Sequence, residues 1–263
     1  MLLAIDVGNT NIVLGVFEAA VLRHSWRLAT MRERTADEMG LLVSELLERA
    51  GIRPSAVAGV VMASVVPPLT ASVIEMSERY LGARPLNLEP GVNTGMPVLY
   101  DSPAEVGADR IVNSIAAYEA YGRVRNTPLI VVDFGTATTF DAVSTQGEYL
   151  GGVICPGIQI SADALFQRAA RLPRIEVRKP ARVIGKTTVN SMQSGLFFGY
   201  VGMVEGLVRR MRTELGGKAF CVATGGLADV IAPETDEVEA VDRDLTLTGL
   251  RLVWERNQNH SSE

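Results

Sequence analysis

An acid–glycine–hydroxyl segment occurs twice in this chain, each time directly after an apolar run. The first copy is Asp6-Val7-Gly8-Asn9-Thr10 and the second is Asp133-Phe134-Gly135-Thr136-Ala137-Thr138. Each pattern predicts a strand that ends on a carboxylate and enters a turn. In such a turn the carboxylate can hold a hydrated metal ion, while glycine lets backbone N–H groups approach a phosphate. Because the two aspartates lie 127 residues apart, nearly half the chain, the repeat predicts two related half-molecules that bind one nucleotide.

The flanking sequence predicts that both halves begin alike, with three strands in a meander. Alternating and apolar runs place the strands of the first half at 2–7, 12–17 and 21–28, and those of the second at 129–133, 139–143 and 149–155. The remaining expected elements of the first half are a helix after the capping box at 35–38, a strand at 57–64, a chain break at 67–68, a helix at 69–81 and a strand at 86–88. Those of the second half are helices at 159–170, 189–215, 228–231 and 245–256, strands at 219–223 and 237–241, and a frayed tail at 257–263.

Composition excludes several classes of protein. The net charge of −5 argues against a general binder of nucleic acid or of anionic membranes. Cys155 and Cys221 lie in apolar, strand-like runs, so we expect two reduced core thiols and no disulfide framework or zinc site. The N-terminus lacks a signal-peptide pattern, and the longest apolar stretch, 56–66, is too short to span a bilayer. These features predict a cytoplasmic protein.

A third chemically suggestive segment lies between the two aspartate turns. Ser102 and Pro103, with Glu105, predict a helix start, and Gly107-Ala108-Asp109-Arg110 falls in the opening turns of that helix. The carboxylate and guanidinium, with the amide of Asn113, could seat a small anionic substrate and take a proton from its hydroxyl. The alternative is a solvated helix start, in which Asp109 favours the helix dipole and pairs with Arg110.

Six segments in this order resemble the type III pantothenate kinases, a bacterial family of the acetate kinase, sugar kinase, Hsp70 and actin superfamily. They are Asp6–Asn11, Tyr100–Pro103, Gly107–Arg110, Asp133–Thr138, Gly151–Gly157 and Ala223–Gly226, and the similarity runs from Met1 to about Trp254. The aspartate turns are shared across the superfamily, whereas Gly-Ala-Asp-Arg between them is much more specific. The resemblance implies a duplicated actin-like (ribonuclease H-like) α/β fold of two domains, 1–117 and 118–263, with a closing helix that can pack back on the first half. It also implies ATP-dependent phosphorylation of pantothenate to 4'-phosphopantothenate, the first step of coenzyme A biosynthesis.

The resemblance further implies a role for each matching residue. Asp109 would accept the proton of the pantothenate hydroxyl, Asp6 would hold Mg²⁺ through water, and Asp133 would bind a monovalent cation, K⁺ or NH₄⁺. Arg110 is placed for the pantothenate carboxylate, and Thr188 reaches pantothenate in the neighbouring subunit of a homodimer, with Thr187 as the alternative. The implied substrate residues are Tyr100, Gly107, Ala108, Asp109, Arg110 and Thr188, and the implied ATP residues are Asp6, Val7, Gly8, Asn9, Thr10, Asn11, Ile12, Val13, Thr136, Gly225 and Gly226.

Three other functions remain open, and two further patterns carry no function. The chain could be another phosphotransferase of the superfamily or a polyphosphate hydrolase, or a nucleotide-binding regulatory protein without turnover. Gly185-Lys186-Thr187 is not a P-loop, because the first glycine of that motif would fall on Pro180. The basic stretch 171–186 lacks interleaved aromatic residues and predicts a solvated loop. His24 and His260 lie outside every motif and are expected at the surface or at a strand edge.

Overall fold

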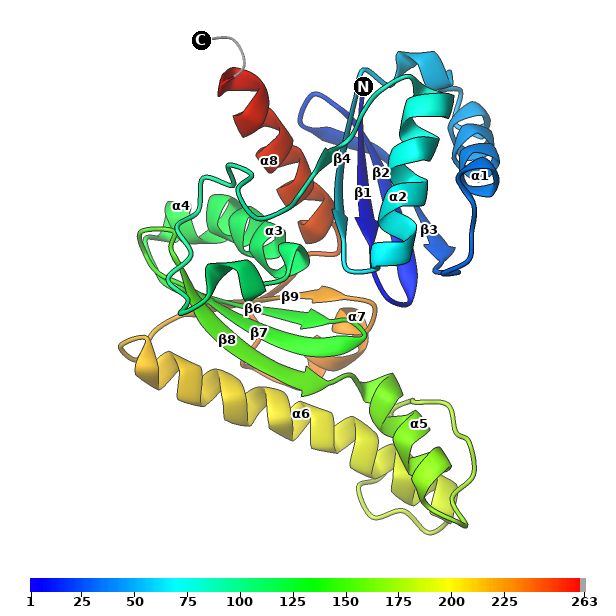
Figure 1. The fold of residues 1–263 in the computed structure, drawn as a ribbon. Coiled ribbons are helices and arrows are strands. Elements are labelled where there is room, and N and C mark those ends of the chain that lie inside the picture. The colour runs from blue at the N-terminus through cyan, green and yellow to red at the C-terminus, as the bar shows by residue number, and fades with distance from the viewer. Residues whose placement is uncertain (261–263) are drawn as a thin grey trace. The chain divides into compact units, whose positions relative to one another are not determined.

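The computed structural model describes residues 1–260, which form two compact units (Figure 1). The first unit comprises residues 1–96, 102–116 and the C-terminal segment from 245. The second comprises residues 97–101 and 117–244. The chain therefore passes between the units four times, and the C-terminal helix belongs with the N-terminal sheet.

The first unit is built on a five-stranded mixed sheet with the order β3-β2-β1-β4-β5. The predicted meander is confirmed, since β1 pairs antiparallel with β2, and β2 with β3. The strand β4 then runs parallel to β1, and β5 runs parallel to β4. The strand bounds are β1 Leu2–Val7, β2 Asn11–Glu18, β3 Val21–Ala29, β4 Gly59–Ser64 and β5 Leu86–Asn87.

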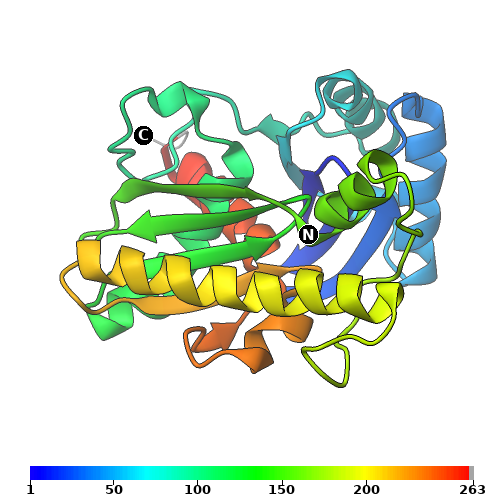
Figure 2. The same ribbon diagram turned by 90° about the horizontal axis from the view of Figure 1, so that it is seen from below.

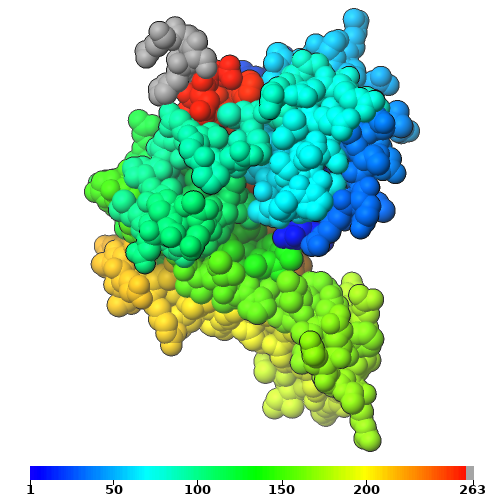
Figure 3. All heavy atoms as spheres, in the orientation of Figure 1, coloured from blue at the N-terminus to red at the C-terminus, as the bar shows by residue number. Residues whose placement is uncertain are grey.

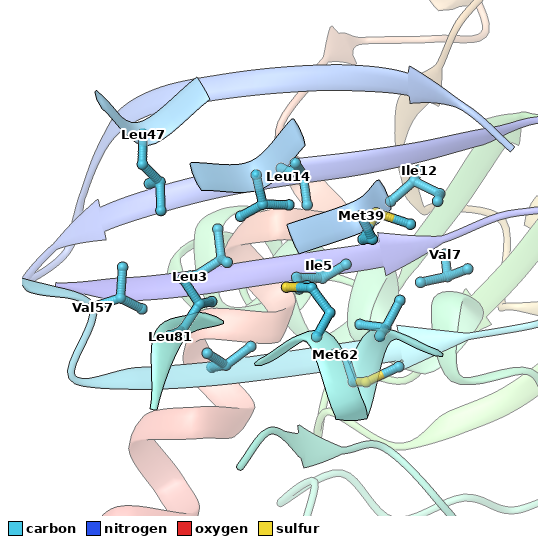
Figure 4. Packing of buried hydrophobic residues seen from close by; sticks show 14 of the residues in the cluster. Leu3, Ile5, Val7, Ile12, Leu14, Met39, Leu47, Val57, Met62 and Leu81 are labelled. Carbon is cyan, nitrogen blue, oxygen red and sulfur yellow. The ribbon is translucent and has the colours of Figure 1, made fainter. Parts of the chain in front are cut away.

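The two faces of this sheet are covered by different helices. Leu3, Ile5 and Val7 of β1 point into a core with α1 (Ala36–Arg49) and α2 (Pro67–Met76), as Figure 4 shows. On the opposite face, Gly15 and Gly59 leave room for Leu247 and Trp254 of α8 (Leu245–His260). The alternation along β1 is what sends one set of side chains to each face.

The helix starts in the first unit follow local signals in two cases. The capping box of α1 is present, with Thr35 N donating to Glu38 Oε2 at 2.9 Å and Glu38 N donating to Thr35 Oγ1 at 3.3 Å. The two prolines at 67–68, expected to interrupt regular structure, instead form the first turn of α2. A proline in the first turn loses no helical hydrogen bond. This helix continues as a π-helical turn, η2 (Ser77–Leu81).

The predicted continuous helix from Pro103 is wrong. Residues Pro103–Glu105 form a single 3₁₀ turn, η3, and α3 (Ala108–Ala117) begins only after Val106 and Gly107. Val106 is extended (φ −78°, ψ 123°), and no side-chain cap is formed by Ser102. The interruption reorients the chain so that Ile111, Val112 and Ile115 of α3 are buried, which shows tertiary packing overriding a local start signal.

The second unit repeats the sheet of the first. Its order is β10-β9-β6-β7-β8, with β6–β7 and β7–β8 antiparallel and β9 parallel to β6, so the second predicted meander is also confirmed. The helix α6 (Thr188–Glu214) runs along one face of this sheet (Figure 2) and buries Phe197, Val204 and Val208 against it. The other bounds are β6 Leu129–Phe134, β7 Ala137–Val143, β8 Tyr149–Pro156, β9 Phe220–Gly225, β10 Ala240–Val241, α4 Arg123–Arg125, α5 Ile158–Arg168 and α7 Ala228–Ile231, with short turns η1 Pro54–Ala56, η4 Tyr118–Gly122 and η5 Ala232–Glu234.

Several smaller expectations are settled by the structure. The closing helix continues to His260 instead of fraying from 257, while residues 261–263 lie outside the described residues, as does the side chain of His260. His24 is exposed on the edge strand β3. Both cysteines are free, but only Cys221 is buried, and Cys155 is half-buried. In the part of the chain that is described, no helix is long and apolar enough to cross a membrane.

Candidate active site

The first aspartate turn follows the central strand of the first unit. Asp6 lies opposite Val13 of β2 and Ala63 of β4. The Gly8 N–H donates to the Asn11 carbonyl at 3.0 Å, and a Cβ on Gly8 would lie 3.0 Å from that same oxygen. Glycine is therefore needed here for close approach within the turn, and its N–H is used inside the turn.

Thr30, which sequence reasoning missed, holds this turn from outside. Its hydroxyl donates to the Gly8 carbonyl at 2.7 Å, and its N–H donates to the Thr10 carbonyl at 3.0 Å. No motif in the sequence marks Thr30, because its contact depends on where β3 ends. Among the residues implied to bind ATP, Val7 and Ile12 are buried in the core, so only their backbone atoms can face a nucleotide. Asn9 and Thr10 are exposed at the tip of the turn.

The Gly-Ala-Asp-Arg segment forms the start of α3 in the first unit. The Arg110 N–H donates to Asp109 Oδ1 at 2.9 Å and to the Gly107 carbonyl at 3.1 Å. A Cβ on Gly107 would lie 2.5 Å from Asp109 Oδ1, so the carboxylate folds over a position that has no side chain. Arg110 is only 8% exposed. Arg110 is therefore not solvated, whereas Asp109 is half-buried at the helix start.

Asn113 does not act as a solvent-facing amide beside Asp109. It is 1% exposed, and its Oδ1 accepts a hydrogen bond from Thr246 Oγ1 of α8 at 2.7 Å. The helix spacing that placed Asn113 next to Asp109 is right, but the amide serves the packing of α8 on α3.

The second aspartate turn has the same place in the second unit. Asp133 of β6 lies opposite Thr139 of β7 and Thr224 of β9. Gly225 has φ +90°, and a Cβ there would overlap Asp133 Oδ1. The carboxylate and this glycine turn are thus in direct contact, and Gly226 follows at an exposed position.

Thr136 is exposed at the tip of the second turn and packs by its backbone on Gly157, since a Cβ on Gly157 would overlap the Thr136 carbonyl. Gly157 precedes α5, whose start is held by Tyr200 of α6 through hydrogen bonds with Ser161 Oγ and the Pro156 carbonyl. Sequence reasoning placed Gly157 in a family segment without a role.

The remaining substrate candidates lie elsewhere in the second unit. The Tyr100 ring is 6.4 Å from that of Tyr149, measured between centroids. Thr187 is the N-cap of α6 and accepts from the Asn190 N–H at 3.2 Å, whereas Thr188 is the first, exposed residue of the helix. The first unit thus carries Asp6–Val13 and Gly107–Arg110, and the second carries Tyr100, Asp133, Thr136, Thr188, Gly225 and Gly226.

The two aspartates are equivalent in the repeated topology. Each is the fifth residue of the central strand of its sheet, with an antiparallel neighbour on one side and a parallel one on the other. Each is followed two residues later by glycine. The duplication expected from the sequence is therefore present at the level of individual strand positions.

The donor chemistry fits a cation that arrives with a nucleotide. Among residues 1–260, no three or more His, Cys, Asp or Glu side chains are grouped so as to hold a metal ion. Magnesium in phosphoryl-transfer sites is commonly held by one or two carboxylates together with substrate phosphates and water. A lone carboxylate in each turn suits that arrangement better than a closed metal cage.

A surface hollow of about 400 Å³ in the second unit is separate from these residues. Within it, the Arg212 guanidinium donates to the carbonyls of Ala219 and Glu237 and forms ion pairs with Glu237 and Glu239. Its donors are therefore committed to the protein. The hollow is lined by Thr127, Arg212, Gly217, Lys218, Ala219, Phe220 and Glu239.

Comparison with known proteins identifies both family and fold. Residues 2–210 match the model of a family described as type III pantothenate kinase. A type III pantothenate kinase from Moorella thermoacetica is 58% identical over 257 residues, covering 98% of this chain and 100% of that protein. A Campylobacter jejuni structure described as a Baf family transcriptional activator has a TM-score of 0.60 at 20% identity, covering 98% of this chain and 99% of that one. The inorganic polyphosphate/ATP-glucomannokinase from an Arthrobacter species has a TM-score of 0.51 at 15% identity, with the same coverage. These likenesses confirm the duplicated actin-like fold.

Proposed function

Since the chain belongs to the type III pantothenate kinase family, we propose that it transfers the terminal phosphoryl group of ATP to the primary hydroxyl of pantothenate. The product is 4'-phosphopantothenate, and the reaction opens coenzyme A biosynthesis. The observation that carries this proposal is the start of α3, where the Asp109 carboxylate lies over Gly107 beside the buried Arg110. A carboxylate and a guanidinium on adjacent residues suit a substrate that carries both a hydroxyl and a carboxylate.

In this proposal Asp109 accepts the hydroxyl proton while the hydroxyl oxygen bonds to the terminal phosphorus and ADP leaves. Arg110 binds the pantothenate carboxylate, and Tyr100 and Thr188 contact the rest of the substrate. Asn9, Thr10 and Thr136, exposed at the tips of the two turns, bind the ATP phosphates. Phosphoryl transfer needs mainly positioning and charge neutralisation, so no nucleophilic side chain is required.

We further propose that Asp6 holds Mg²⁺ through water and that Asp133 binds K⁺ or NH₄⁺. A bound Mg²⁺ neutralises charge on the phosphate oxygens. The equivalent strand positions of Asp6 and Asp133 support a pair of cation sites, one from each aspartate turn. We propose one nucleotide-binding half in residues 1–117 and the other in the segment from 118, whose closing helix α8 packs back on the first half.

A homodimer is proposed through α6 and the loop before it. Gly195, Gly199 and Gly202 lie along one exposed face of α6, with open space where a Cβ would be. The preceding loop lies at the surface (Figure 3), where Ile184 is 82% exposed. Bare glycines let two helices approach closely, and an exposed apolar side chain gains by being covered. Thr188, at the start of α6, would then lie at this interface and reach the partner's site.

The net charge of the chain indicates which kinds of partner we do not propose. The acidic net charge of −5 disfavours nucleic acid and anionic membranes, and a coenzyme A enzyme of this kind is proposed to act in the cytoplasm.

One coupled assay tests the proposed function. Purified protein is given ATP and Mg²⁺ with K⁺ or Na⁺, and ADP release is followed with pantothenate, acetate, glucose or polyphosphate in turn. We expect ADP release with pantothenate alone, faster in K⁺ than in Na⁺. Turnover of acetate, a sugar or polyphosphate instead would support another phosphotransferase or a hydrolase. Absence of turnover in every salt would contradict the kinase proposal and favour a regulatory nucleotide-binding protein.

A further inference from the structure

We propose that Tyr149 and Asp141 are positioning residues that set the Tyr100 ring against pantothenate. The inference rests on the proposed function, in which Tyr100 contacts the substrate. All three residues belong to the second unit, and the family resemblance gives no role to Tyr149 or Asp141.

The backbone fixes where Tyr100 begins. The Leu99 N–H donates to the Tyr149 carbonyl at 2.8 Å, and the Tyr149 N–H donates to the Pro97 carbonyl at 2.8 Å. Val98 forms a parallel bridge with Tyr149. The segment 97–99 thus extends the sheet beyond β8. Its hydrogen bonds with Tyr149 determine its register.

Two neighbours then fix the Tyr100 ring. Its centroid lies 6.4 Å from that of Tyr149, with the rings tilted by 57°, which is a favourable aromatic arrangement. A Cβ on Gly151 would lie 3.5 Å from Cδ2 and Cε2 of Tyr100, so the ring lies over a bare α-carbon. Gly151 has φ +118°, which side-chain-bearing residues rarely adopt. Tyr100 itself is 38% exposed, which leaves part of the ring accessible to a ligand.

A buried hydrogen bond holds Tyr149 in turn. Its hydroxyl donates to Asp141 Oδ1 at 2.8 Å, and both residues are 0% exposed. Thr139 Oγ1 donates to the other carboxylate oxygen of Asp141 at 3.3 Å. Because a buried carboxylate must be hydrogen-bonded, loss of the Tyr149 hydroxyl would remove one of the donors that stabilise Asp141. The Tyr149 ring is therefore held in one position under Tyr100.

The same strand pair also carries the proposed cation site. Thr139 lies directly opposite Asp133 in the β6–β7 register, and Asp141 is two residues further along the same face. We infer that one rigid strand, β7, supports both the Asp133 turn and the Tyr100 ring. Because the Asp141–Tyr149 bond reaches Tyr100 directly and the Asp133 turn only through β7, a change in that bond should alter pantothenate binding more than ATP binding.

The variant that tests the inference is Tyr149→Phe, which removes only the hydroxyl that donates to Asp141. Tyr100→Ala measures the full contribution of the Tyr100 ring. Tyr80→Phe is the matched control, because the Tyr80 hydroxyl donates to Asp37 Oδ1 at 2.7 Å at an exposed place in the first unit. For each variant the KM for pantothenate, the KM for ATP, kcat and the melting temperature are measured.

We expect Tyr149→Phe to raise the KM for pantothenate roughly three- to tenfold and to leave the KM for ATP within about twofold of the wild-type value. The increase is smaller than the full effect of one lost hydrogen bond to a charged group, because Tyr149 acts on the substrate only through Tyr100. Asp141→Asn, which keeps an acceptor oxygen for the Tyr149 hydroxyl, should be milder than Asp141→Ala. Tyr80→Phe should match wild type in both constants.

The possible failures are distinguishable. Wild-type protein that does not phosphorylate pantothenate would remove the proposed function itself. An unchanged KM for pantothenate in Tyr100→Ala would remove the premise that Tyr100 contacts substrate. A Tyr149→Phe protein that behaves like Tyr80→Phe, or one whose two KM values rise equally, would overturn the positioning role while leaving the function intact.

Discussion

At the scale of single residues, Asp109 and Asp133 share one feature, which is a glycine directly against the carboxylate. A Cβ on Gly107 would lie 2.5 Å from Asp109 Oδ1, and one on Gly225 would overlap Asp133 Oδ1. Gly225 also needs its positive φ, whereas Gly107 is needed for space alone. The sequence predicted both glycines as parts of motifs. It could not show that they make room for the two acids, because that contact depends on folded geometry.

Gly107→Ala tests whether a bare α-carbon at Gly107 is needed to position the Asp109 carboxylate. The added methyl forces the Asp109 carboxylate away from its place over Gly107, while an alanine before a helix causes little backbone strain. We expect kcat/KM for pantothenate to fall by at least about tenfold, which corresponds to about 1.4 kcal/mol, with a melting temperature close to wild type. Steady-state kinetics and thermal unfolding measure the two effects. Full activity in Gly107→Ala would show that the carboxylate position is not critical.

The buried thiol of Cys221 should make the stability of the protein depend on pH. Burial is the main cause that raises the pKa of this thiol, so the folded state keeps its proton at a pH where the unfolded thiol loses it. The unfolded state then binds fewer protons, and the free energy of unfolding falls as pH rises above about 8.5, with a limiting slope of about 1.4 kcal/mol per pH unit.

Urea unfolding of wild type and Cys221→Ala between pH 8 and 9.5 measures this slope. The variant should show a flatter pH dependence, although loss of a packed thiol lowers its stability at pH 8. The half-buried Cys155, whose pKa burial also raises, is the comparison, and Cys155→Ala should flatten the curve less. Parallel curves for wild type and Cys221→Ala would contradict the prediction.

At the scale of elements, strands and helices were predicted to within a few residues, and the helix expected from Pro103 is the main exception. Both meanders follow from apolar runs and turn residues that are local in sequence, and the structure confirms them. The helix expected from Pro103 fails because its start signals, although present, do not determine whether Val106 will be extended. Similarly, α8 was predicted as a helix, but its packing on the first sheet depends on Gly15 of β2 and Gly59 of β4, which only the fold brings under it.

The packing of α8 on α3 predicts that a glycine-to-alanine substitution in α8 lowers the stability of the protein. Glycine to alanine inside a helix normally stabilises by up to about 1 kcal/mol. A Cβ on Gly249 of α8 would instead overlap the backbone carbonyl of Val112, so we expect Gly249→Ala to destabilise by about 1–3 kcal/mol. Gly206→Ala is the control, because its methyl would meet only the end of the flexible Arg210 side chain at 3.2 Å. Urea midpoints that rise in both variants would contradict close packing at Gly249.

At the scale of the whole molecule, the duplication of the sheet is the main organising fact. It was predictable because the repeated turn sequence survives in both halves. The contacts that support each turn were not predictable, since Thr30 holds the first turn and Gly157 packs on the second. These supporting residues differ between the halves, which agrees with the different roles proposed for Asp6 and Asp133.

The proposed homodimer predicts complementation between two inactive proteins. If each site uses its own Asp109 and the partner's Thr188, Asp109→Asn and Thr188→Ala homodimers are both impaired, but a mixed dimer contains one intact site. After subunit exchange at equal amounts, about a quarter of wild-type activity should return. Light scattering should give twice the chain mass of 28.3 kDa for wild type. Failure of mixtures to regain activity, with exchange shown by mass, would place Thr188 outside the partner's site.

The most direct test of the central claim is the rate at which 4'-phosphopantothenate forms, measured by mass spectrometry for wild type and Asp109→Asn. Asparagine keeps the size of the side chain at the start of α3 but cannot accept the hydroxyl proton. We predict a loss of roughly 10²–10⁴-fold in product formation, the usual contribution of general acid–base catalysis, with ATP affinity unchanged. Product formation by Asp109→Asn at the wild-type rate would contradict the assignment of Asp109 as the residue that accepts the proton.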